Sequence, residues 1–397
     1  MKCATLLKRC NALFHGDAFR PIGSHAVHPA FLTIRAISLL VFRYRESTRK
    51  RFATLGKWWG MSIGSDLDFL FSEAEITSSC VSVQGSSMGN ALVRRMNKGE
   101  VVRTAPGLYA RAAYWSGLDP ASRALHIIQG LCDQRPDRIF CFVSAALVHG
   151  LDVSYRLLGN AHIAASRSRR GNGIVYHAAP VSGAGFAGMI RVTSLVQTVF
   201  DCIRSLSFPF ALAIADSALR KTERSAGDFA DEMACCCKGR VGMARALAIM
   251  GKADGRAENG GESYARAVML EHGVMEPDLQ IEHWDPIGGG SFRTDFGWHG
   301  LPTGDVAGEL DGVVKTEDPT MLGFRTIRDA LRDERMRESR LTALGLKVAR
   351  FTFPQVCAVR PLLRILDGFG VPRDASNVTV LPDPFTPARG FLYGKMR

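Results

Sequence analysis

The chain has 397 residues, of which 46% are apolar and 22% are charged, and these proportions are typical of a folded globular protein. The length exceeds what one core normally holds and predicts two or three domains. The formal net charge of +12 is concentrated in residues 1–60, where eleven Lys or Arg and two Asp or Glu give +9, so the remaining residues carry only +3. The charge is therefore weak support for nucleic-acid binding by the folded part.

Residues 1–60 are a basic N-terminal extension with no sustained helical or alternating hydrophobic period. Their longest apolar run, Phe31 to Phe42, is interrupted by Arg35 and is too short to cross a bilayer. Two interpretations stay open. Either Met61 is the true start of the protein, or the extension is a disordered basic tail.

The ten cysteines include the run Cys235-Cys236-Cys237 but no C-x-x-C pair of the kind that binds zinc. We find no signal peptide before them. We therefore expect buried or inert thiols and a reducing cytoplasm. Because the longest apolar run is too short to span a bilayer, we also expect no membrane partner.

Residues 61–115 have the pattern of a winged helix-turn-helix, in which three short helical segments precede a hairpin. We expect these segments over Ser65–Ala74, over Ile76–Gly85 (a short helix or a turn), and from Ser86 to Asn97 or Lys98. Two short strands around Pro106-Gly107 then form the hairpin, or wing.

The third helix of such a domain fits the major groove, and cations of the wing can contact phosphates. The predicted DNA-binding residues are Asn90, Arg94, Arg95, Lys98, Arg103 and Arg111. An alternative stays open, because many winged helices bind protein or act only as spacers.

The stretch LVRRMNKGEVVRTAPGLYA, residues 92–110, resembles the N-terminal domain of AbiEi-type antitoxins of the type IV toxin–antitoxin class. In that family a helix ends in a basic pair, followed by Gly and by a hairpin with Gly-x-Tyr. The matching residues here are Arg94, Arg95, Gly99, Gly107 and Tyr109. The resemblance implies repression of the protein's own operon and opposition to a partner toxin, by analogy.

Residues 116–250 alternate helical and strand-like stretches and are predicted to form a mixed α/β connecting domain. The segment VTSLVQTVFDC, residues 192–202, is similar to one that follows the winged helix in the same antitoxin-like family. Three histidines in this region, His149, His162 and His177, are scattered without metal-ligand spacing, so we expect structural or surface roles. The Gly-rich, polar residues 251–261 predict a linker.

Residues 262–372 are predicted to form an α/β domain. We expect helices at 262–274, at about 326–344 and from Pro354, and strands at 279–284, 291–298, 305–310 and 346–353. The predicted element order is helix, antiparallel strands, acidic strand, helix and strand. This is the order of the PD-(D/E)xK, restriction-endonuclease-like core. The Pro-containing tail, residues 373–397, reads as mostly extended or disordered.

Phosphodiester cleavage explains the acidic residues of this domain. Divalent cations beside the phosphate activate water, and Mg²⁺ prefers carboxylate oxygens. Asp295, Glu309 and Asp311 are the predicted metal ligands and catalytic residues, and Glu262 on the first helix could complete the cluster. Lys315 would orient water or offset charge in the transition state.

The stretches ELDGVVK (309–315) and ERMRESRLTALGLKVARFTF (334–353) resemble an endonuclease-like family related to very-short-patch repair endonucleases. The resemblance implies acidic metal-binding roles for Asp295, Glu309 and Asp311, and matches Lys315 to a Lys after the Asp-Gly. Glu334, Arg335 and Arg337 match the charged helix of that family, and Arg350 matches its last strand.

The chain also departs from this pattern. Asp311 stands where a Glu-x-Lys motif has its Lys, and the His that many relatives carry after the Asp-Gly is absent. Two interpretations of this domain stay open: a catalytically active nuclease and a degenerate or regulatory domain. In the second interpretation, Glu309 pairs with Arg350 or Arg337.

The sequence thus predicts an α+β multidomain protein that binds DNA. The first functional hypothesis is an antitoxin-like regulator with a nuclease-fold C-terminal domain and a possible cognate toxin as partner. The alternative is a Mg²⁺-dependent DNA endonuclease that acts in defence or repair. A protein-only scaffold is a third reading, which predicts no salt-dependent DNA affinity.

Overall fold

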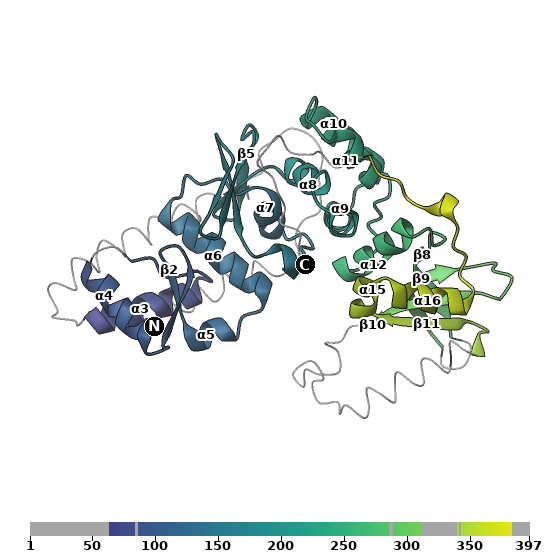
Figure 1. Cartoon of the computed structure of the whole chain (residues 1–397), viewed down its shortest axis with the longest axis horizontal. Coiled ribbons are helices and arrows are strands. Elements are labelled where there is room, and N and C mark those ends of the chain that lie inside the picture. Colours follow the sequence, from purple (N-terminus) through teal and green to yellow (C-terminus); the bar gives the residue numbers. More distant parts are fainter. Residues whose placement is uncertain (1–62, 84–85, 286–288, 312–339, 341–342, 383–397) are drawn as a thin grey trace. The chain divides into compact units, whose positions relative to one another are not determined.

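The computed structural model describes residues 63–83, 86–285, 289–311, 340 and 343–382, which form an α+β protein with four small open sheets (Figure 1). The N-terminal extension, residues 1–60, lies outside the described residues. Within the part that the structure describes, no helix is long and apolar enough to cross a membrane.

Residues 63–111 form a small unit of two helices and a hairpin. Its elements are α3 (Ile63–Ile76), α4 (Ser86–Asn97), β1 (Val101–Ala105) and β2 (Leu108–Arg111). Its core contains the buried side chains of Leu67, Phe71, Leu92 and Val101. Gly107 makes the turn between the strands with a φ of +69°, a conformation that glycine adopts without strain.

The expected first and third helices and the hairpin are present, and of the short helix or turn expected between them, residues 77–83 contain a turn and no helix. The turn follows Ile76 directly, and Val81 then pairs with Tyr109 of β2. The backbone N–H and C=O of Val81 both bond to Tyr109, at 2.8 and 2.9 Å. This pairing holds the chain extended, and it buries Val81 in the core of the unit.

Residues 112–250 alternate helices with short strands. The helices are α5 (Ala112–Ser116), α6 (Pro120–Gln134), α7 (Phe142–Val148), η1 (Tyr155–Leu157), α8 (Leu195–Ile203), α9 (Phe208–Thr222), α10 (Ala226–Cys236) and α11 (Met243–Met250). The strands are β3 (Ala161–Ala165), β4 (Arg169–Gly171), β5 (Ile174–Ala178), β6 (Gly185–Ala187) and β7 (Ile190–Val192).

Local sequence explains where these helices begin. Asp119 caps α6, because its carboxylate accepts bonds from the N–H groups of Ala121 and Ser122, and Pro120 occupies the first turn, where no N–H is needed. The sheet has the order β3-β5-β4, with β3 parallel to β5. Helices α7 to α11 pack around a large apolar core that includes the fully buried Phe200 and Phe208.

The expected linker, residues 251–261, is a packed connection. Ala257 is 1% exposed, and the N–H of Asp254 donates to the Asp216 carboxylate at 2.8 Å. A Cβ on Gly255 would lie 3.0 Å from the backbone N of Arg220, so glycine is needed here for close approach to α9. The Gly-rich composition therefore reflects tight packing.

The C-terminal elements are α12 (Gly260–Glu271), β8 (Asp278–Trp284), β9 (Ser291–Trp298), β10 (Val306–Asp311), β11 (Lys347–Thr352), α15 (Phe353–Ala358), α16 (Arg360–Phe369) and η3 (Ala375–Asn377). The sheet order is β11-β10-β9-β8, antiparallel except that β11 runs parallel to β10. Helices α12, α15 and α16 pack on this sheet (Figure 1), around Phe296, Trp298 and Phe351.

The strands of this sheet lie within one or two residues of their expected positions. Most of the expected helix at 326–344 lies outside the described residues. The beginning of the tail, which was expected to be mostly extended or disordered, contains the short helix η3 and is held in place, because the N–H of Asp374 donates to Gly273 and that of Thr379 to Leu270, both at 2.9 Å. Residues 383–397 lie outside the described residues.

Candidate functional site

The outer face of α4 is polar and basic. Its exposed side chains are Ser87, Asn90, Arg94, Asn97 and, one residue past the helix, Lys98, with one apolar side chain, Val93, exposed among them. They recur at intervals of three and four residues and therefore share one side of the helix, while Ala91 and Leu92 pack into the core on the other. Neither Arg94 nor Lys98 forms an ion pair with another described residue. Sequence reasoning missed Ser87 and Asn97, which the helical spacing could have included.

Arg95 lies on α4 but has an internal role. Its Nη1 lies 2.6 Å from Oδ1 of Asp68 on α3, and its Nη2 lies 3.1 Å from Oδ2. The bond from Arg95 is the largest cause that lowers the pKa of Asp68. Arg95 thus joins α3 to α4 and is not placed on the outer face.

Arg111 is also held within the unit. Its Nη1 bonds Oε2 of Glu75 at 3.0 Å, and its guanidinium lies over the ring of Phe71, 5.5 Å from the centroid. It ties β2 to α3. Four of the six predicted DNA-binding residues are exposed: Asn90, Arg94, Lys98 and Arg103. The other two, Arg95 and Arg111, form ion pairs within the unit.

The predicted acidic residues lie on β9, β10 and α12. The pairing of β9 with β10 sets Gly308 opposite Phe296, and the same register continued by one residue sets Glu309 opposite Asp295. The Asp295 carboxylate accepts a bond from the N–H of Leu310 at 2.8 Å. Strand pairing thus brings Asp295 and Glu309 to one region of the sheet.

Glu262, in the first turn of α12, is 4% exposed. Its carboxylate accepts bonds from the N–H of Glu258 at 2.8 Å and from Nε2 of Gln280 at 2.9 Å. Burial, with the nearby Asp295 carboxylate as the next cause, raises the pKa of Glu262 to about 7. Sequence reasoning did not identify Gln280, which comes from β8.

Arg350 on β11 stands opposite Glu309 in the parallel pairing of β10 with β11. Its Nη2 lies 2.7 Å from Oε2 of Glu309, and its Nη1 lies 3.3 Å from Oδ1 of Asp311. One guanidinium thus binds both carboxylates of β10. The pairing of Glu309 with Arg350, which the sequence left as one alternative, is present.

These residues do not form a ready metal centre. Among the described residues, no group of three or more His, Cys, Asp or Glu side chains is arranged to hold a metal ion. The carboxylates of Glu309 and Asp311 face the Arg350 guanidinium, which supplies the positive charge that a cation would otherwise bring. The donor set expected for Mg²⁺, Asp295, Glu309 and Asp311, therefore does not fit a preassembled site.

Four further residues from the nuclease resemblance lie outside the described residues: Lys315, Glu334, Arg335 and Arg337. Arg340 is described, and its Nη1 bonds Oδ2 of Asp285 at 2.9 Å. Asp285 is 2% exposed and follows β8, so the pair joins two distant parts of the C-terminal region. Sequence reasoning had no signal for this pair.

Comparison with known proteins gives distant similarity. The chain is similar to uncharacterized proteins from two strains of Mycobacterium tuberculosis, each 28% identical over 257 residues. The alignment covers 64% of this chain and 88% of each relative. No protein-family model matches the chain, and no solved structure matches it.

Proposed function

We propose that this chain is a DNA-binding regulator of the antitoxin-like kind, in which residues 63–111 act as a winged helix-turn-helix. Helix α4 would enter the major groove, and the β1–β2 hairpin would be the wing. The observation that carries the proposal is the separation of cations within this unit. Arg95 and Arg111 hold it together, while Arg94 and Lys98 remain on the exposed face of α4.

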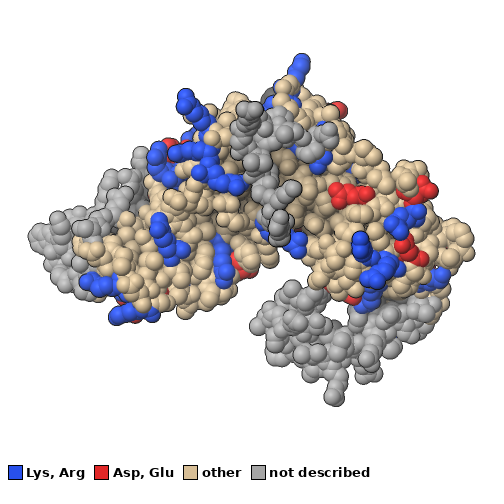
Figure 2. Space-filling view, viewed as in Figure 1, with Lys and Arg blue, Asp and Glu red and all other residues tan. Residues whose placement is uncertain are grey.

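The exposed residues of α4 suit the two kinds of contact that DNA recognition needs. Arg94 and Lys98 can neutralise phosphates, which releases counterions and supplies sequence-independent affinity. Asn90 has an amide that can bond the edge of an adenine. In the view of Figure 2, basic side chains are spread over the part of the surface from α3 to β5 with few acidic ones among them. On this face of the molecule, the excess of basic side chains favours a polyanionic partner.

The test is a mobility-shift titration of the full chain on a duplex from its own promoter region. Arg94→Glu/Lys98→Glu should weaken binding by tenfold or more, because two phosphate contacts become repulsive, at about 1.4 kcal/mol for each factor of ten. The matched control is Lys221→Glu/Lys238→Glu, which reverses two exposed cations outside the unit. Equal affinity of both double variants would contradict the proposal.

In this proposal the C-terminal domain has a nuclease-like fold with a regulatory role. Its element order, α12, β8, β9, β10 and β11, supports the fold, and the Arg350 guanidinium on Glu309 and Asp311 supports the absence of catalysis. The domain would assist DNA binding or contact a cognate toxin. Co-purification of the full chain with a nucleotidyltransferase-like toxin encoded beside it tests the second role.

A Mg²⁺-dependent endonuclease is the second candidate. The observation that favours it is the buried carboxylate of Glu262, which lies near Asp295 at the sheet. This candidate predicts that the full chain nicks plasmid DNA with Mg²⁺ or Mn²⁺ and that Asp295→Asn abolishes nicking. Metal-independent DNA binding without nicking favours the regulator.

A further inference from the structure

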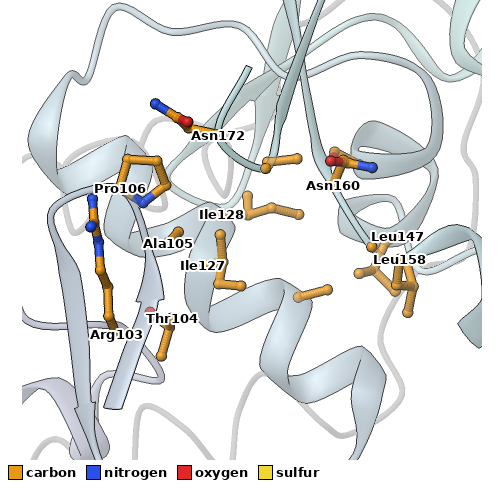
Figure 3. Close-up of a pocket in the computed structure, with 15 residues that line it drawn as sticks. Arg103, Thr104, Ala105, Pro106, Ile127, Ile128, Leu147, Leu158, Asn160 and Asn172 are labelled. Carbon is orange, nitrogen blue, oxygen red and sulfur yellow. The ribbon is translucent and has the colours of Figure 1, made fainter. Parts of the chain in front are cut away.

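A cavity of about 470 Å³ lies between the β1–β2 hairpin and the residues that follow it. The hairpin supplies Arg103 to Pro106, helix α6 supplies Ile127 and Ile128, and the opposite side carries Leu147 and Leu158. In Figure 3 the two isoleucines lie between the hairpin and these leucines, with Asn172 and Asn160 above them. Its volume is within the range of small-molecule sites.

The lining selects a ligand by charge. Apolar side chains, half-buried or buried, form its floor, while Arg103, Asn160 and Asn172 are exposed. Among the described residues that line it there is one cation, no carboxylate and no aromatic ring. A guanidinium binds carboxylates and sulfonates through charged hydrogen bonds. A nucleobase is disfavoured, because recognition of a base usually uses aromatic stacking.

We propose that this cavity binds a small amphipathic anion, with a hydrocarbon body on the apolar floor and a carboxylate at Arg103, and that the ligand releases the protein from DNA. The second half of the inference rests on the proposed function. Arg103 is the exposed cation of the wing. When the ligand binds the Arg103 guanidinium, that group can no longer contact a DNA phosphate. The ligand and DNA therefore weaken the binding of each other.

The hairpin is placed to transmit this effect. Nε2 of Gln134 on α6 donates to the carbonyl oxygens of Pro106 and Gly107, both at 3.3 Å. A Cβ on Gly130 would meet the Leu108 side chain at 3.0 Å, so β2 also packs closely on α6. A ligand between the hairpin and α6 therefore contacts both the wing and its support.

The binding experiment uses the full chain with anilinonaphthalene sulfonate as fluorescent reporter and decanoate as competitor. Decanoate should displace the reporter, whereas decanol, its neutral counterpart, should compete at least tenfold more weakly. Arg103→Gln should weaken decanoate binding by about tenfold, and Lys238→Gln, which removes an exposed cation elsewhere, should not change it. Ala124→Phe, which fills the cavity from α6, should abolish binding while its unfolding midpoint stays near that of the parent.

The coupling experiment repeats the DNA titration with decanoate present. Decanoate should weaken DNA binding by about fivefold or more in the parent and have no effect in Ala124→Phe, which keeps its own DNA affinity. If decanoate displaces the reporter saturably but the chain binds no DNA, the result supports the ligand site and contradicts the proposed function. No displacement by decanoate below about 1 mM, or equal displacement from Arg103→Gln, Ala124→Phe and the parent, would overturn the ligand site.

Discussion

The register of β10 and β11 places Arg350 beside two carboxylates of the acidic strand, those of Glu309 and Asp311. Glu309 is 5% exposed, and its carboxylate bonds the guanidinium at 2.7 Å. The sequence could supply both residues as candidates, because each falls in a recognisable strand. It could not choose between a metal ion and Arg350 as the partner of Glu309, since that choice depends on how β11 pairs with β10.

Replacing Arg350 by Met should lower the free energy of unfolding by about 2–3 kcal/mol, because Glu309 would lose a charged partner while it stays buried. Urea unfolding at neutral pH measures this loss. The double variant Glu309→Gln/Arg350→Met should recover part of it. No loss in Arg350→Met would show that Glu309 does not depend on this ion pair.

Two histidines illustrate a contact that sequence reasoning missed. His162 and His177 are scattered in the sequence and were expected to have structural or surface roles. The parallel pairing of β3 with β5 brings them together, with Nδ1 of His162 2.7 Å from Nε2 of His177. Burial is the main cause that lowers the pKa of His162 to about 3 and that of His177 to about 4. His162 also lies against Phe142, 5.1 Å between ring centroids.

These lowered pKa values predict loss of stability in acid. The folded state favours neutral rings, so this stabilisation is fully present above the ordinary pKa of 6.5 and is lost as the pH falls towards about 4. At 1.36 kcal/mol per pH unit, each ring should contribute a loss of about 2 kcal/mol between pH 6.5 and pH 5.

Urea unfolding across this pH range tests the histidine prediction. The variant His162→Leu/His177→Leu should have a flatter pH dependence than the parent, whatever its stability at neutral pH. Parallel curves for the two proteins would contradict the assignment.

At the scale of elements, local sequence patterns predicted many of the helices and strands of the described chain. They did not predict which segments pair with one another. The strands β8 to β11 were predicted from short strand-like segments between turn signals, and α4 from Met88, Leu92 and Met96, which recur every four residues. The segment after α3 was only partly predicted. Val81 pairs with Tyr109, which lies twenty-eight residues later in the sequence, and no local pattern shows this pairing. The connection before α12 was misread because glycines that allow close packing resemble glycines that give flexibility.

Gly255 tests this interpretation of the connection. Gly255→Ala should lower the free energy of unfolding by about 1–3 kcal/mol, because the added Cβ would lie 3.0 Å from the Arg220 backbone N. The matched control is Gly185→Ala on β6, where an added Cβ has no neighbour within 4 Å. If both variants unfold at the same urea concentration as the parent, residues 251–261 are not the packed connection described above.

At the scale of the whole described chain, α12 belongs to two cores. Ala267 and Leu270 pack with helices α7 to α11, whereas Val268 and Met269 pack with the C-terminal sheet. The buried guanidinium of Arg266 on α12 bonds both carboxylate oxygens of Asp216 on α9 at 3.0 Å. The sequence boundary at 251–261 therefore does not separate two independent folding units.

Asp216→Ala should lower the free energy of unfolding by about 3–5 kcal/mol, because it leaves the Arg266 guanidinium buried without its principal partner. In the parent, α9 and β9 should lose hydrogen-exchange protection together as urea increases, since both depend on α12. Well-separated losses in the parent would contradict the shared helix.

The salt dependence of DNA affinity tests the proposed DNA binding most directly, because its slope scales with the number of phosphate contacts that a protein makes. The account predicts that log Kd of the parent rises with log salt concentration and that Arg94→Gln/Lys98→Gln reduces this slope by about 1–2, near 0.9 for each lost contact. The same slope and affinity in the parent and the double variant would contradict DNA binding through the outer face of α4.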